Sequence, residues 1–373
     1  MRILVRATNW VGDAVMSLPA LQALRQAFPS AHIAILTRPW VADLYARESF
    51  ANEVILYNAP KGWLGLQEKW QLARDLRSRR FDLALLLQNA FEAAALVRLA
   101  GIPERIGYDR DARGWLLTKA VRVPGTGQIP GHQRFYYLEL LRRAGLISNL
   151  PDWPAIRLGG AEAARVAGQQ RFREMGFRSA VGVSPGAAYG SAKRWIPERF
   201  ADAAASFGRP VALFGSGDER QLCEQIADRL RRAHVPVHNF AGQTTLREYI
   251  ELAAACSVYL TNDSGGMHIA SALGVPTVAI FGATDDVATG PTGPLARVVR
   301  EPVECSPCLL RECPIDHRCM LAVTSERVVT EARDLVSLSP GSLVDDQQHG
   351  SDRDGKDHAN GSEQKSTDQD KED

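Results

Sequence analysis

The segment YLTNDSGGMHIA at residues 259–270 is the most informative feature of this sequence. It opens in an apolar run typical of a buried parallel strand and ends in a pattern typical of a helix. The polar turn 263–266 lies between them, where a strand delivers a helix N-terminus. The unpaired N–H groups of such a terminus attract anions, and glycines let a ligand approach the backbone. We expect a phosphate-binding turn here, although an ordinary capped turn also fits the local sequence.

Short apolar runs alternate with helical patterns along most of the chain. The predicted strands lie at residues 3–5, 32–36, 53–57, 82–87, 181–184, 211–214, 258–261 and 277–281, and the predicted helices at 14–27, 67–80, 198–207, 219–232, 246–255 and 266–273. This alternation predicts an α/β fold with doubly wound parallel sheets. The Pro- and Gly-containing residues 146–160 interrupt it, so we expect two domains, 1–150 and 151–337.

Charge and composition limit the possible partners. The 44 basic and 43 acidic residues nearly balance, so a general nucleic-acid binder is not expected. Residues 338–373 are polar and acidic and are predicted to be disordered, which leaves a basic body suited to an anionic substrate or an acidic membrane surface. No apolar run reaches the ~18 residues of a membrane-spanning helix, and the start MRILVRATNW is not a signal segment. We expect a cytoplasmic protein with peripheral membrane contact.

Three further loops follow predicted strands, at the edge where open α/β sheets bind ligands. The first, RATNWVGD at residues 6–13, is not the GxGxxG of a nicotinamide dinucleotide site, and Asp13 could simply cap the next helix. The second, residues 184–195, places Lys193 and Arg194 after small residues, as suits a diphosphate. The third is the glycine-rich turn 214–219. The loops at 184–195, 214–219 and 263–266 together predict a nucleotide-diphosphate site in the second half.

In this order the segments resemble the heptosyltransferases of lipopolysaccharide core assembly, glycosyltransferase family nine. The resemblance covers about residues 1–336 and rests on these segments: NWVGD at 9–13, LPAL at 18–21, PGA at 185–187 with KRW at 193–195, FGS at 214–216, LTNDSGGMH at 260–268 and AIFG at 279–282. It implies a GT-B architecture, in which two Rossmann-like domains face a cleft. It also implies an inverting transfer of heptose from ADP-heptose to the first heptose of a lipid-linked inner core, at the cytoplasmic face of the inner membrane.

The resemblance also assigns roles to residues. Asp13 is the expected catalytic base, and Lys193 with the amides of the 264–266 turn is expected to stabilise the departing ADP. The expected donor-binding residues are Ser184, Gly186, Arg194, Gly215, Asp263, Ser264, Gly265, Gly266 and His268. The expected acceptor-binding residues are Asn9, Trp10, Arg105, Arg110, Arg113 and His132. No Asp-x-Asp pair follows a matching strand, so we expect catalysis without a cofactor or catalytic metal.

Four cysteines form a separate cluster. Cys305, Cys308, Cys313 and Cys319 have the spacing C-x2-C-x4-C-x5-C. In a reducing cytoplasm such a cluster suits a structural zinc site, with an iron–sulfur cluster second, although disulfides or free thiols fit as well.

Three other functions stay open at this point. A family-nine paralogue could use another inner-core acceptor. A two-Rossmann sugar-nucleotide epimerase would need an acid and a base flanking the sugar. A non-catalytic nucleotide-binding module would need neither Asp13 nor Lys193.

Overall fold

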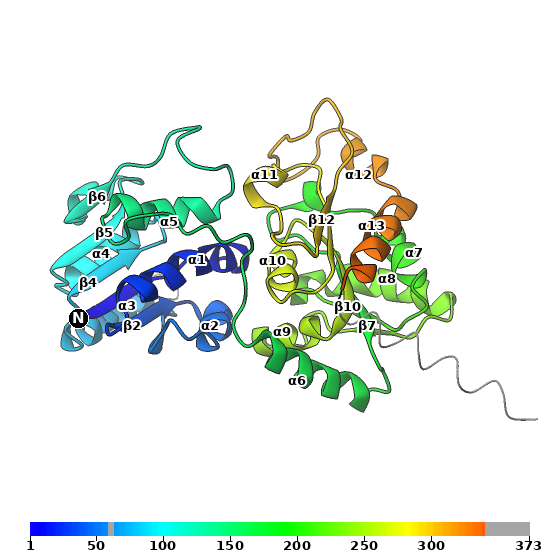
Figure 1. Ribbon diagram of the computed structural model, residues 1–373, viewed down its shortest axis with the longest axis horizontal. Helices are drawn as coiled ribbons and strands as arrows, with labels where there is room; N and C mark the ends of the chain where they lie inside the picture. The colour runs from blue at the N-terminus through cyan, green and yellow to red at the C-terminus, as the bar shows by residue number, and fades with distance from the viewer. Residues whose placement is uncertain (59–62, 340–373) are drawn as a thin grey trace, which may run out of the picture.

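The computed structural model describes residues 1–58 and 63–339 and shows two α/β units side by side (Figure 1). Each unit is built on a six-stranded parallel sheet, which confirms the predicted fold class. Residues 340–373, where disorder was predicted, lie outside the described part. Within that part, no helix is long and apolar enough to cross a membrane.

The first sheet has the order β3-β2-β1-β4-β5-β6. Its strands are β1 Arg2–Arg6, β2 His32–Thr37, β3 Glu53–Leu56, β4 Leu83–Leu86, β5 Glu104–Tyr108 and β6 Lys119–Val121. One face packs against α1 Val11–Ala27, α2 Pro39–Ala46 and α5 Arg134–Arg143, and the other against α3 Trp63–Ser78, α4 Phe91–Leu99 and the short helix η1 Gly114–Leu116. Alternate residues of β1 enter the two cores, as the two-residue period of a strand requires.

The second sheet repeats this plan with the order β12-β11-β10-β7-β8-β9. Its strands are β7 Ala180–Ser184, β8 Val211–Leu213, β9 Val237–Asn239, β10 Cys256–Asn262, β11 Thr277–Ile280 and β12 Ala296–Val299. Its main helices are α6 Ala161–Glu174, α7 Pro197–Ala205, α8 Arg220–Arg232, α9 Leu246–Ala254, α10 Gly265–Ala272 and α13 Ser325–Ser337, with shorter η2 Ser191–Lys193, η3 Gly217–Glu219, α11 Asp286–Thr289 and α12 Arg318–Ala322. In both sheets the strand order reverses next to the first strand, between β1 and β4 and between β7 and β10. Such switch points are where open α/β sheets bind ligands.

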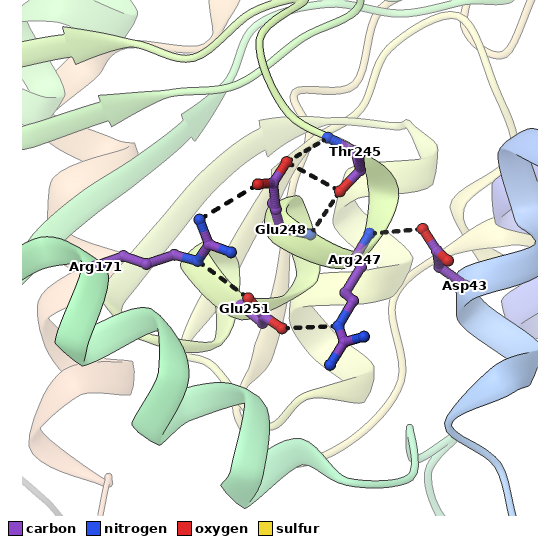
Figure 2. A network of polar contacts seen from close by, with 6 residues as sticks. All are labelled: Asp43, Arg171, Thr245, Arg247, Glu248 and Glu251. Carbon is purple, nitrogen blue, oxygen red and sulfur yellow. Dashed lines mark hydrogen bonds and ion pairs between the residues drawn. The ribbon is translucent and has the colours of Figure 1, made fainter.

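Two pairs of helices join the units. Helix α1 packs on α10 and α2 packs on α9, and Figure 1 shows α1 and α10 facing each other across the boundary. Figure 2 shows the second contact: the Asp43 carboxylate of α2 accepts a hydrogen bond of 3.1 Å from the backbone N–H of Arg247 in the first turn of α9. Thr245 caps that turn, and its side chain accepts from Glu248 N at 3.2 Å. Arg171 of α6 joins Glu251 of α9 at 3.1 Å, which ties α6 to the same helix.

Candidate active site

A cavity of about 610 Å³ lies between the two units, at the carboxyl ends of their strands. The predicted residues that line it are Asp13 and Trp10 from the first unit and Ser184, Gly186, Lys193, Gly215, Asp263, Ser264, Gly265, Gly266 and His268 from the second. All three predicted phosphate loops therefore reach one cavity. Arg194 does not line it.

The N-terminus of α10 opens into this cavity. Ser264 is the N-cap residue, but its side chain makes no capping hydrogen bond. Its hydroxyl lies 3.2 Å from the Thr261 hydroxyl instead. The first N–H groups of α10 therefore keep their capacity to bind an anion, as the sequence predicted.

Helix α1 begins directly opposite, and glycines allow this close approach. A Cβ at Gly265 would lie 3.0 Å from Val11 Cβ, and a Cβ at Gly12 would lie 3.1 Å from His268 Cδ2. A larger residue at Gly265 would therefore push the two helix starts apart. The positive ends of two helices meet in one cavity for this reason.

Lys193 forms a buried ion pair in this cavity. Its Nζ lies 2.6 Å from Asp263 Oδ2, and the two side chains are 13% and 6% exposed. The Thr284 hydroxyl donates to the same carboxylate oxygen at 2.7 Å. Lys193 Nζ also lies 4.8 Å from the centre of the Tyr189 ring. Two neighbours, Asp263 and Tyr189, thus hold the ammonium group in the cavity, and Thr284 holds the Asp263 carboxylate in turn.

Asp13 is the third residue of α1 and does not cap it, because the start of this helix has no side-chain cap. The Tyr137 hydroxyl of α5 donates a hydrogen bond of 3.2 Å to Asp13 Oδ1. Burial raises the pKa of Asp13 above its usual value, while the Tyr137 hydrogen bond and the charge of Lys193 act in the opposite direction. A carboxylate with a raised pKa is better suited to accept a proton than an exposed one.

His268 lies in the first turn of α10 and is 4% exposed. Burial lowers its pKa to about 4, so the imidazole is neutral at physiological pH. A neutral imidazole can donate one hydrogen bond from one ring nitrogen and accept one at the other. His268 therefore adds a polar group without adding a charge.

A second cavity of about 310 Å³ lies on the first unit and shares Asp13 and Trp10 with the larger one. Its lining is mainly polar: Thr8, Asn9, Gln88, Asn89, Arg110, Gln133, Tyr136 and Tyr137 join Asp13, Trp10 and Leu87. Of the predicted acceptor residues, Asn9, Trp10 and Arg110 line it. Asp13 is thus common to both cavities.

The other three predicted acceptor residues lie elsewhere. Arg105 at the start of β5 donates to the carbonyls of Leu116 and Ile102, away from the ligand-binding edge. Arg113 is fully buried and donates to Tyr108 O and Asn89 Oδ1 at 3.0 Å each, so it supports the cavity wall from behind. His132 lies 3.0 Å from Gly290 O, a contact that joins the two units.

Several residues in or beside the cavities had no strong local signal in the sequence. Tyr137 and Thr284 are far in sequence from the carboxylates that they contact. Arg311 lies in the cysteine-rich segment yet lines the larger cavity, with its guanidinium 5.0 Å from the Tyr189 ring centre. The carbonyl of Arg311 accepts from Ala192 N at 3.0 Å, which anchors this segment beside Lys193.

The described part of the structure does not show the metal site that was expected at the four clustered cysteines. All six cysteines are free, and the described residues contain no group of three or more side chains placed to hold a metal ion. Burial, together with the nearby Cys305, Cys313 and Cys308 thiols, raises the pKa of Cys319. Cys305 is exposed whereas Cys319 is buried, so the four sulfurs share a region but differ in depth.

Comparisons with known proteins identify the family of this chain. The model of glycosyltransferase family 9 (heptosyltransferase) matches residues 69–318. The chain is 34% identical to lipopolysaccharide heptosyltransferase 2 of Escherichia coli over 310 residues, covering 80% of this chain and 88% of that protein. It is 28% identical to lipooligosaccharide heptosyltransferase 2 of Campylobacter jejuni over 342 residues, covering 90% and 99%. The solved structure of E. coli ADP-heptose heptosyltransferase II matches with a TM-score of 0.75 and 30% identity, over 91% of this chain and 99% of that one. The chain therefore belongs to glycosyltransferase family 9, the heptosyltransferases.

Proposed function

We propose that this glycosyltransferase moves L-glycero-D-manno-heptose from ADP-heptose to the first heptose of a lipopolysaccharide inner core, with inversion. The observation that carries the proposal is the position of Asp13, which lines both cavities. A donor in the larger cavity and an acceptor in the smaller one would meet at this carboxylate. Relatives named heptosyltransferase 2 support the choice of acceptor.

The proposed reaction is a single displacement. The acceptor hydroxyl oxygen bonds to the anomeric carbon while the bond from that carbon to the diphosphate oxygen breaks. Asp13 takes the hydroxyl proton, and the bonding electrons leave with ADP. The raised pKa of Asp13 favours this proton transfer.

Negative charge that develops on the departing ADP has several partners in the larger cavity. Lys193 and Arg311 supply positive charge, and the uncapped start of α10 supplies N–H donors. Fixed donors of this kind stabilise charge as it develops and need little reorganisation during the reaction. Asp263 orients Lys193 through their 2.6 Å contact and keeps a second oxygen for a sugar or ribose hydroxyl.

The proposal also covers the two domains, the membrane and the clustered cysteines. We place the acceptor domain at residues 1–150 and the donor domain at 151–337, and expect no cofactor in the reaction. The lipid-linked acceptor implies peripheral contact with the cytoplasmic face of the inner membrane. A structural zinc at Cys305, Cys308, Cys313 and Cys319 is supported only by their spacing, and elemental analysis of the purified protein tests it.

The deciding experiment supplies purified protein with ADP-heptose and inner-core acceptors that carry no heptose, one heptose or two. We expect ADP release and a mass increase of one heptose only with the one-heptose acceptor, and neither product with Asp13→Asn. Transfer to a heptose-free acceptor would instead assign the activity to a paralogue. Conversion of the sugar nucleotide without any acceptor would favour an epimerase.

A further inference from the structure

Helices α3 and α4 and the short helix η1 pack together on the outer face of the first sheet and expose large apolar side chains. These side chains are Leu66, Trp70, Phe91, Leu99 and Trp115, and we call this surface the aromatic face. The exposed fractions of Trp70 and Trp115 are 57% and 66%. Isolated exposed apolar residues are common, but two tryptophans, a phenylalanine and two leucines on adjacent helices mark an interaction surface.

Contacts between the helices join this surface into one patch. The rings of Phe91 and Trp115 lie 6.2 Å apart, so the start of α4 meets η1. Lys69 of α3 forms an ion pair of 2.9 Å with Glu92 of α4. Trp70 follows Lys69 in α3 and Phe91 precedes Glu92 in α4, so the backbone positions of both aromatic residues lie where the two helices meet.

The cations of the aromatic face are arranged for an external partner. The guanidinium of Arg74 lies 4.8 Å from the Trp70 ring centre, and that of Arg98 lies 5.4 Å from the Trp115 ring centre. Among the described residues, neither arginine forms an ion pair, and neither does exposed Arg77. The acidic residues of α3 and α4 are Asp75 and Glu92, which are paired with Arg79 and Lys69, and exposed Glu68. Five cations oppose these three carboxylates: Lys69, Arg74, Arg77, Arg79 and Arg98. The face therefore offers net positive charge beside its exposed rings.

The aromatic face adjoins the smaller cavity. Leu87, Gln88 and Asn89 line that cavity at the end of β4, and the chain then enters α4 at Phe91. A molecule lying against Phe91 would thus be beside the entrance to the proposed acceptor site.

We propose that the aromatic face binds an anionic lipid bilayer and holds the smaller cavity at the membrane surface. Tryptophan and other aromatic rings favour the bilayer interface, and unpaired arginines are attracted to acidic headgroups. An uncharged protein partner would leave the guanidinium groups without counter-ions. The inference rests on the proposed function only where it assigns the lipid-linked acceptor to this cavity. The membrane contact itself is independent of the reaction.

The test measures cosedimentation of the full chain with two kinds of vesicle, equimolar phosphatidylglycerol and phosphatidylethanolamine, or phosphatidylcholine alone. An aromatic variant carries Trp70→Ser with Trp115→Ser, and a charge variant carries Arg74→Gln with Arg98→Gln. The matched control carries Val166→Ser with Arg173→Gln, exposed positions on α6 of the second unit. Thermal unfolding of each variant checks that it is folded.

We expect wild type and control to bind the anionic vesicles, less so at high salt, and to leave phosphatidylcholine unbound. The charge variant should partition roughly 25-fold more weakly, because each cation near an acidic surface contributes a factor of about five. Both face variants should retain turnover on a delipidated, water-soluble acceptor while losing turnover on vesicle-embedded acceptor.

Two results would overturn the inference. Either the wild-type protein does not cosediment with anionic vesicles, or both face variants bind these vesicles as strongly as the control variant does. Face variants that change the oligomeric state of the protein without lipid would assign the surface to a second copy of the chain. Vesicle binding does not require heptose transfer. The cosedimentation result can therefore be interpreted even if the protein proves not to transfer heptose.

Discussion

Asp13 faces two cavities, and its carboxylate has one hydrogen-bond donor from α5. Asp13→Asn preserves size and the ability to accept from Tyr137 but cannot take a proton. We expect kcat to fall by ~10²-fold or more with ADP affinity unchanged, as for loss of a general base. Steady-state kinetics and calorimetric ADP titration measure the two quantities. Unchanged turnover would leave Asp13 without a chemical role.

The same substitution should affect stability in a pH-dependent way. Burial raises the pKa of Asp13, so the folded state binds its proton more tightly than the unfolded state. Stability therefore falls as pH rises from the unfolded pKa through the folded pKa, and the loss is complete above the latter. Asp13→Asn should unfold at a higher temperature than wild type at pH 8, and this gain should shrink toward pH 4. A melting temperature of Asp13→Asn below that of wild type at pH 8 would contradict a raised pKa of Asp13.

Lys193 and Arg194 are adjacent cations, yet only Lys193 lines the larger cavity, the proposed donor site. Lys193→Ala should weaken ADP binding by ~1.5–3 kcal/mol, the contribution of a hydrogen bond to a charged group. Arg194→Ala is the matched control and should bind ADP as wild type does. Calorimetry compares them, with thermal unfolding measured in parallel because Lys193→Ala leaves Asp263 without its cation. Equal ADP affinities in the two variants would remove Lys193 from the diphosphate site.

Sequence patterns placed residues at the larger cavity where the signal was local. The turn 263–266 follows a buried strand, so its position beside this cavity follows from strand direction alone. Arg113 shows the limit, because an arginine in an Arg-rich loop looks exposed although it is buried behind the cavity wall. The Tyr137 contact with Asp13 spans 124 positions, and no local pattern encodes it.

The starts of helices α1 and α10 approach closely, and the proposed reaction needs this approach for donor and acceptor to meet. Gly265→Ala would place a Cβ 3.0 Å from Val11 Cβ and 3.4 Å from Gly12 N. We expect kcat/KM of Gly265→Ala to fall about tenfold or more, because small displacements of the reacting groups slow the reaction strongly. The melting temperature should change little. Ser271→Ala on the same helix, where the hydroxyl only donates back to His268 O, is the control. Full activity of Gly265→Ala would show that the helix starts can separate freely.

Central strands were predictable because strands buried on both faces are continuous apolar runs. All eight predicted strands are present, and helices such as α1 and α8 end within a residue or so of their predicted bounds. The missed strands β5, β6, β9 and β12 lie toward the sheet edges, and most are short or carry charged residues. β6, β9 and β12 are edge strands with one neighbour each, and β5 lies beside the edge strand β6. A strand near an edge with a solvent-exposed face has a weaker apolar pattern, so its pairing with a neighbouring strand determines its structure more than its own sequence does.

For the whole molecule, sequence patterns predicted two similar units but not their relative placement. That placement depends on contacts between distant residues, such as His132 with Gly290 and Asp43 with Arg247. It also depends on the absence of side chains at Gly12 and Gly265. The shared position of Asp13 in both cavities is a consequence of this packing and could not be read from either half alone.

Removal of the contact between Asp43 and α9 would test how strongly the relative position of the two units affects the reaction. Its carboxylate accepts from the first turn of α9, and the preceding residues Thr244 and Thr245 line the donor cavity. Asp43→Ala removes a favourable anion from a helix N-terminus, an interaction of ~0.3–1 kcal/mol at an exposed site. We expect kcat to fall about two- to fivefold with ADP affinity unchanged, because the proposed ADP site lies on the second unit whereas Asp13 belongs to the first. Asp75→Ala, which removes an exposed carboxylate of α3 far from this boundary, should alter neither quantity. A variant that loses ADP affinity but keeps kcat would show instead that Asp43 shapes the donor cavity through Thr245 and does not hold the two units together.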